Sequence, residues 1–105
     1  AMEMELRDRT RDYLEMFNTG KMDAVQPFLL PPQGQEGPFL LGIRKKLDAG
    51  TQFRKVQFRT IAVSGDAGTV GILCDLASAK GLSPETEVTL RWRRVSGSWR
   101  VVEHP

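Results

Sequence analysis

The feature that most constrains the fold is a change of hydrophobic period at Gly50. Before Gly50, apolar residues recur at the three- and four-residue spacing of α-helices, and after it apolar and polar residues alternate as in β-strands. Helical and strand patterns are therefore segregated along the chain, which favours an α+β fold over a parallel α/β fold. The length of 105 residues suits one domain. We expect that domain to span residues 2–105, with Ala1 resembling a cloning remnant.

The first half of the sequence predicts three helices. The first ends at Gly20 and buries one stripe of side chains, formed by Leu6, Thr10, Tyr13, Leu14 and Phe17. A second helix is predicted over residues 22–29, and Pro27 makes it either kinked or very short. After a loop at 31–38, Pro38 suits the first turn of a third helix that stops at Gly50.

The second half predicts four strands, at residues 53–63, 69–78, 85–95 and 99–103. Short connections make them an antiparallel meander, with residues 79–84 expected to form a loop. The apolar side of the first strand switches near Thr60, which predicts a bulge, and Gly71 inside the second strand indicates a bend. The expected fold is thus N-terminal helices packed on a curved four-stranded antiparallel sheet.

Composition narrows the classes of function. A net charge of +2 is too small to imply a nucleic-acid partner. With Cys74 as the single cysteine and His104 as the single histidine, the sequence offers no intrachain disulfide, no cysteine zinc site and no catalytic triad, and we expect no metal or cofactor. No apolar run approaches the ~20 residues that cross a membrane. The expected location is the cytoplasm, with a secreted or lipoprotein origin left open if a leading segment has been removed.

Two segments resemble the nuclear-transport-factor-2-like superfamily, whose members have a cone-shaped, cystatin-like α+β fold. Residues 12–25 (DYLEMFNTGKMDAV) are similar to its first helix, turn and second helix. Residues 90–102 (LRWRRVSGSWRVV) are similar to its last hairpin, in which Gly-x-Trp precedes the final strand. Order and spacing agree over most of the chain.

The resemblance implies either an enzyme with its active site inside the cone or a dimeric binding domain without chemistry. Tyr13 falls where the helix-1 tyrosine of a ketosteroid isomerase would lie. That enzyme also needs a carboxylate base and a protonated acid, but the corresponding segments, residues 29–34 and the stretch around Thr89 and Leu90, contain no acid. An isomerase function is therefore not expected.

Asp75 is the acidic residue that stands out, because it is flanked by apolar residues on the second strand. A carboxylate in such surroundings can serve as a base or anchor a ligand. A surface ion pair is the commoner arrangement and is the interpretation we favour. The enzyme alternative is an isomerase, dehydratase or cyclase in which Asp75 acts as the base and Tyr13 as a donor; it requires both side chains to converge on one cavity.

Basic residues surround two tryptophans near the C-terminus. Arg91, Arg93 and Arg100 would form a nucleic-acid surface only if they shared an exposed face with Trp92 or Trp99. Strand alternation separates them, so nucleic acid is not the expected partner.

The sequence thus predicts a non-catalytic domain that binds a small apolar ligand or a protein partner. We expect a homodimer, on the habit of the family and because one face of a curved sheet is left uncovered by the helices. The candidate ligand-binding residues are Tyr13, Phe17, Phe28, Asp75 and Trp92.

Overall fold

The computed structural model describes residues 1–103, and His104 lies outside this range. The elements follow one another as α1 (Met2–Phe17), α2 (Met22–Val25), a 3₁₀ turn η1 (Gln26–Phe28), α3 (Glu36–Asp48), β1 (Gln52–Ser64), β2 (Ala67–Ser78), β3 (Gly81–Val95) and β4 (Ser98–Glu103). The α+β order and the short second helix are confirmed, since Pro27 lies in η1 directly after α2. None of the helices described is long and apolar enough to cross a membrane.

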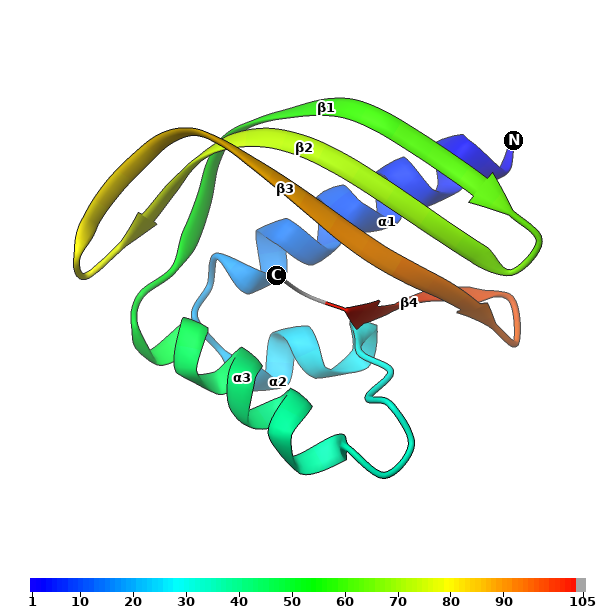
Figure 1. Cartoon of the computed structure of the whole chain (residues 1–105), viewed down its shortest axis with the longest axis horizontal. Helices are drawn as coiled ribbons and strands as arrows, with labels where there is room; N and C mark the ends of the chain where they lie inside the picture. Colours follow the sequence, from blue (N-terminus) through cyan, green and yellow to red (C-terminus); the bar gives the residue numbers. More distant parts are fainter. Residues whose placement is uncertain (104–105) are drawn as a thin grey trace.

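The strands form one antiparallel sheet in the order β1-β2-β3-β4, which confirms the meander. Figure 1 shows the sheet arching over α1, with α2 and α3 on the open side. The predicted loop at residues 79–84 is wrong: Ser78 pairs with Gly81, so only a tight turn separates β2 from β3. Pro84 is accommodated within β3 because a register shift opposite Asp75 leaves it outside the regular ladder.

Helix α1 packs its predicted stripe on the inner face of the sheet. All five stripe residues are buried, and the hydroxyl of Thr10 donates to the Leu6 carbonyl oxygen at 2.8 Å. From the sheet, Phe53 of β1 and the inward residues of β2, β3 and β4 join the core. Gly68 lies in close contact with α1 and β4: a Cβ added there would sit 2.6 Å from Leu6 Cδ2 and 3.1 Å from Trp99 Cζ3.

Bulges bend the sheet. Pairing of β1 with β2 shifts register between Arg54 and Gln57 and again between Phe58 and Thr60, which confirms the bulge predicted near Thr60. Pairing of β2 with β3 shifts between Cys74 and Leu76. The irregularities bring two non-glycine residues to positive φ, Lys55 at 51° and Glu85 at 50°.

Both edges of the sheet are partly occupied by other segments of the chain. At β4, Leu29 forms a parallel bridge with Val101, and the Leu30 N–H donates to the Val101 carbonyl oxygen at 2.8 Å. At β1, the side-chain amide of Asn18 pairs with Phe53 in both directions: Nδ2 donates to the Phe53 carbonyl oxygen, and Oδ1 accepts from the Phe53 N–H, each at 2.8 Å. Asn18 therefore mimics a neighbouring strand and fixes the end of α1 to the start of β1.

The close approach at Gly68 predicts that Gly68→Ala destabilises the fold by about 1–3 kcal/mol, because the methyl group overpacks against Leu6 and Trp99. Gly42→Ala is the matched control: Gly42 lies within α3 with open space around its Cα, so alanine should stabilise by about 0.5–1 kcal/mol. Urea unfolding measures both. Equal effects of the two substitutions would contradict the packing argument.

The pairing of Asn18 with Phe53 predicts that Asn18→Ala lowers the free energy of unfolding by about 1–3 kcal/mol. The substitution removes the side chain that hydrogen-bonds to both the N–H and the carbonyl oxygen of Phe53, which are part-buried. Asn18→Asp keeps an acceptor for the Phe53 N–H but sets a carboxylate oxygen against the Phe53 carbonyl, so it should also destabilise. Gln57→Ala, on an exposed stretch of the same strand, is the control and should change stability little. Chemical denaturation distinguishes these cases, and a neutral Asn18→Ala would show that this pairing is dispensable.

Candidate functional site

Four of the five candidate ligand-binding residues gather into one buried aromatic cluster. The Tyr13 ring lies 5.5 Å from Phe28, 5.8 Å from Trp92 and 6.0 Å from Phe17, measured between ring centroids. Each of the four is at most 7% exposed. Burial raises the pKa of the Tyr13 phenol, so this group stays neutral at physiological pH. The four rings pack against one another and form an aromatic core.

Arg9 covers the cluster on one side. Its guanidinium stacks over the Phe28 ring at 4.0 Å, and its Nε donates to the Trp99 carbonyl oxygen at 3.1 Å. Burial, together with the nearby charge of Arg100, lowers the pKa of Arg9. Its role was not expected from the sequence, because the arginine falls between stripe positions of α1 and its contact with β4 spans 90 residues.

Asp75, the fifth candidate, lies apart from the cluster. It pairs with Arg54, which is exposed, and follows Cys74, which faces the core, so its side chain is on the outer face of the sheet. Oδ1 accepts from the Glu85 N–H at 3.1 Å, and Oδ2 lies 3.9 Å from Lys55 Nζ. Asp75 thus joins the bulges of β1 and β3, consistent with the ion-pair interpretation. The structure does not bring Asp75 and Tyr13 to one cavity.

Cys74 is a small apolar residue of the core, being 2% exposed. Burial, and secondarily the charge of Asp75, raises the pKa of its thiol. The thiol is therefore kept neutral, which makes it a poor nucleophile.

A trough on the outer face surrounds Asp75. Its volume is about 510 Å³, and it is lined by Lys55, Gln57, Leu73, Cys74, Asp75, Pro84 and Glu85. It lies where the strands on both sides of Asp75 bulge, so we attribute its shape to the bending of the sheet.

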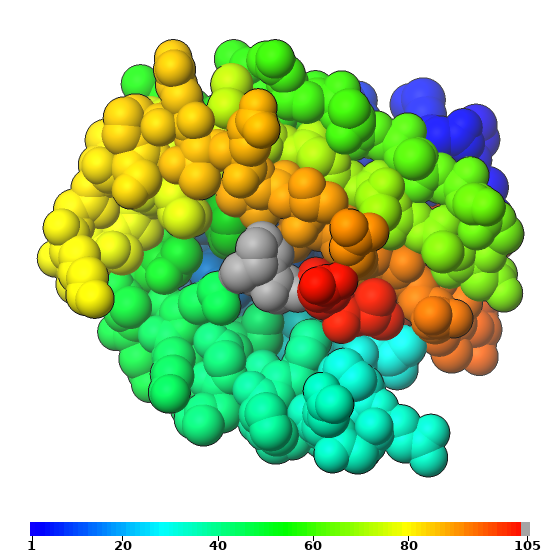
Figure 2. All heavy atoms as spheres, in the orientation of Figure 1, coloured from blue at the N-terminus to red at the C-terminus, as the bar shows by residue number. Residues whose placement is uncertain are grey.

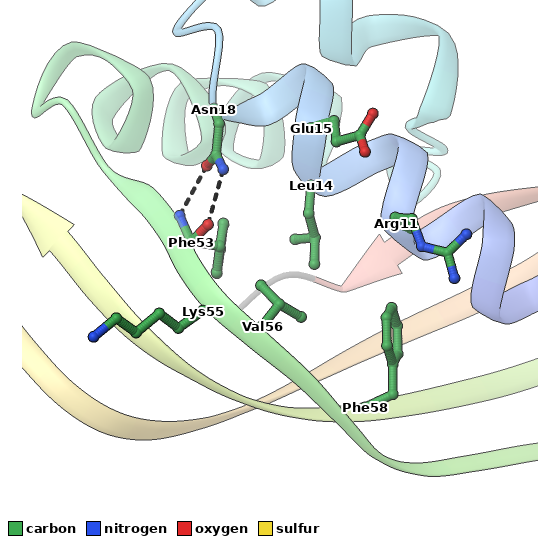
Figure 3. Close-up of a pocket in the computed structure, with 8 residues that line it drawn as sticks. All are labelled: Arg11, Leu14, Glu15, Asn18, Phe53, Lys55, Val56 and Phe58. Carbon is green, nitrogen blue, oxygen red and sulfur yellow. Dashed lines mark hydrogen bonds between the residues drawn. The ribbon is translucent and has the colours of Figure 1, made fainter.

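A groove of about 310 Å³ separates α1 from β1 (Figure 3). Its floor is apolar, formed by Leu14, Phe53, Val56 and Phe58. Arg11 and Glu15 project from α1 along one wall, and Lys55 points away at the far end. Arg11 forms an ion pair with Asp8 at 3.3 Å, so the charges along this groove largely cancel.

A recess of about 240 Å³ opens between the end of α3 and the sheet. It is lined by Lys46, Thr51, Phe53, Leu76, Thr86, Glu87 and Val88. Figure 2 shows the surface hollowed between the yellow end of the β2–β3 hairpin and the green α3. Phe53, Leu76 and Val88 form its apolar wall, and Lys46 and Glu87 are the charged residues in its lining. Val88 faces the core because it alternates with exposed residues along β3, whereas the contribution of Lys46 depends on how α3 packs on the sheet.

The basic residues of the last hairpin point away from its tryptophans. Trp92 and Trp99 are buried in the core, whereas Arg91 and Arg93 are exposed. Arg91 forms an ion pair with Glu103 at 3.1 Å. The structure therefore does not place either tryptophan on the exposed face of Arg91 and Arg93.

The sequence matches no protein-family model and no curated protein. Similarity to solved structures, in contrast, extends over nearly the whole chain. A nuclear-transport-factor-2-like protein of unknown function from Shewanella oneidensis aligns with a TM-score of 0.70 at 16% identity, covering 97% of this chain and 95% of that one. A putative calcium/calmodulin-dependent protein kinase type II association domain from Thiobacillus denitrificans aligns with a TM-score of 0.70 at 17% identity, covering 91% and 88%.

A third similar structure is described as having a cystatin-like fold. It is a protein of unknown function with a cystatin-like fold from Nostoc punctiforme, with a TM-score of 0.62 at 11% identity, covering 94% of this chain and 84% of that one. At these identities the agreement concerns the arrangement of the backbone. Three helices packed on a four-stranded antiparallel sheet, in the same order, give this chain the nuclear-transport-factor-2-like, cystatin-like fold.

Proposed function

We propose that the protein binds a small, largely apolar molecule in the recess between α3 and the sheet, without transforming it. The observation that supports this proposal is the composition of the recess: an apolar wall of Phe53, Leu76 and Val88, with the charged residues Lys46 and Glu87 also in its lining. Binding sites for small molecules commonly combine an apolar lining with a few polar groups that orient the ligand.

The size of the recess limits the ligand. Pockets for drug-sized molecules run to about 300–1,000 Å³, and the recess holds about 240 Å³. A ring compound or a short acyl group suits it better than a steroid-sized ligand. Lys46 and Glu87 both line the recess, so a polar group on the ligand has a hydrogen-bond donor and an acceptor available.

Binding is favoured over catalysis by the placement of the acidic and phenolic groups. Asp75 is on the outer face of the sheet, where it accepts a hydrogen bond from the backbone of Glu85. Tyr13 is fully buried among aromatic rings, and burial raises its phenol pKa. The pair required by the enzyme alternative therefore does not meet around a common substrate atom.

Indole is a suitable test ligand, because it is small, apolar and carries one donor. In ¹H–¹⁵N NMR titrations we expect its chemical-shift changes to cluster at Lys46, Phe53, Leu76 and Val88. Leu76→Lys places a charge on the apolar wall and should weaken binding by roughly tenfold or more. The matched control is Leu82→Lys on the same hairpin, where the leucine is 56% exposed and outside the recess, and it should leave binding unchanged.

Shift changes that spread over the whole sheet, or that persist in Leu76→Lys, would contradict the proposed site. Native mass spectrometry of the protein as purified from cells adds a direct measurement. A stoichiometric non-covalent adduct that is lost in Leu76→Lys and kept in Leu82→Lys would identify the natural ligand.

A further inference from the structure

Two arginines lie directly opposite each other in the last hairpin of the sheet. Arg93 of β3 is paired with Arg100 of β4, so the two side chains leave the sheet on the same face. Like charges at directly opposite positions of a sheet repel and destabilise it. Neither arginine forms an ion pair within residues 1–103. The two positive charges are therefore not balanced within the described part of the chain.

A third arginine reaches the same place from helix α1. The Nε–H of Arg9 donates to the carbonyl oxygen of Trp99 at 3.1 Å, and this carbonyl belongs to the peptide group that joins Trp99 to Arg100. The guanidinium carbon of Arg9 also lies 4.0 Å from the centroid of the Phe28 ring. Burial, and next the charge of Arg100, lowers the pKa of Arg9, which agrees with two guanidinium groups held near each other. Arg9 thus presents a guanidinium of fixed orientation at the edge of β4.

The hydrogen-bond donors of these arginines are only partly used. The terminal nitrogens of Arg9 donate to no acceptor in residues 1–103. Nε of Arg100 is buried and has no partner in the same range, so this side chain gains a hydrogen bond if it turns toward an acceptor. The nearby acids do not supply one: Glu103 is paired with Arg91, and Asp12 raises the pKa of Arg9 through its charge without forming an ion pair with it.

We propose that Arg9, Arg93 and Arg100 bind a phosphate group at the edge of β4. A guanidinium presents a planar fork of donors that pairs with two oxygens of an oxyanion. One fork is enough for a carboxylate, which has two oxygens and one charge. Three guanidinium groups suit a phosphate monoester, which has three acceptor oxygens and close to two charges at neutral pH. The bound anion would also remove the repulsion between Arg93 and Arg100.

This site is separate from the recess between α3 and the sheet. None of its three arginines lines that recess. The phosphate proposal therefore does not rest on the proposed ligand, and indole binding at the recess can be measured independently of it.

The test is a titration with inorganic phosphate, followed by ¹H–¹⁵N NMR of the arginine Nε–H groups at constant ionic strength. The signals of Arg9, Arg93 and Arg100 should shift together along one saturating curve, and acetate should move them less. Arg93→Gln with Arg100→Gln should weaken phosphate binding by roughly tenfold or more, because charge-assisted hydrogen bonds are lost.

The matched control is Arg44→Gln with Arg59→Gln, which makes the same change in net charge at two exposed arginines of α3 and β1. It should leave phosphate binding unchanged. Arg93→Lys with Arg100→Lys keeps both charges but loses the planar forks, so it should also weaken binding. Circular dichroism checks that each variant is folded.

Shifts that do not saturate, that the glutamine variants leave unchanged, or that acetate reproduces equally would overturn the proposal. So would displacement of phosphate by a single-stranded oligonucleotide, which would assign the arginines to a nucleic-acid backbone. A phosphoserine peptide distinguishes the sources of the group. Tighter binding of this peptide than of inorganic phosphate, lost in the glutamine variants, assigns the phosphate to a protein partner, and equal binding assigns it to a small ester. Failure of all arms leaves the indole proposal standing.

Discussion

The structure depends on the bending of one antiparallel sheet. A flat sheet would contact α1 along a single line, whereas the bulged strands wrap around the helix and bury its whole stripe. Pairing shifts register twice between β1 and β2, once between β2 and β3 and once between β3 and β4. Asp75 lies between two of these bulges and accepts the N–H of Glu85, so its carboxylate stabilises the irregular backbone that the curvature requires.

Curvature also divides the molecule into two faces with different properties. The inner face is closed around Tyr13 and Trp92 and leaves a small apolar recess beside α3. The outer face has no helix over it, and it carries the segregated charges of β3. The ligand proposal follows from this division, because the recess beside α3 is where the wall is apolar.

Much of the candidate site could be predicted from the sequence, and part of it could not. The separation of Arg91 and Arg93 from Trp92 was predicted correctly, because alternate residues of a half-buried strand lie on opposite faces of the sheet. The grouping of Tyr13 with Phe28 and Trp92 required the packing of α1, η1 and β3. The loop expected at residues 79–84 was wrong because Pro84 and the small polar residues around it are typical of turns, and only the ladder with β2 shows that a bulge accommodates the proline.

By itself, the sequence determined the helices-then-strands order, the buried stripe of α1 and the meander, because these depend on local periods and short connections. The tertiary structure alone decided the pairing of Asn18 with Phe53, the position of Arg9 over Phe28 and the separation of Asp75 from Tyr13. These contacts join residues distant along the chain, and they are set by where the sheet bends, which local sequence patterns indicate only in part.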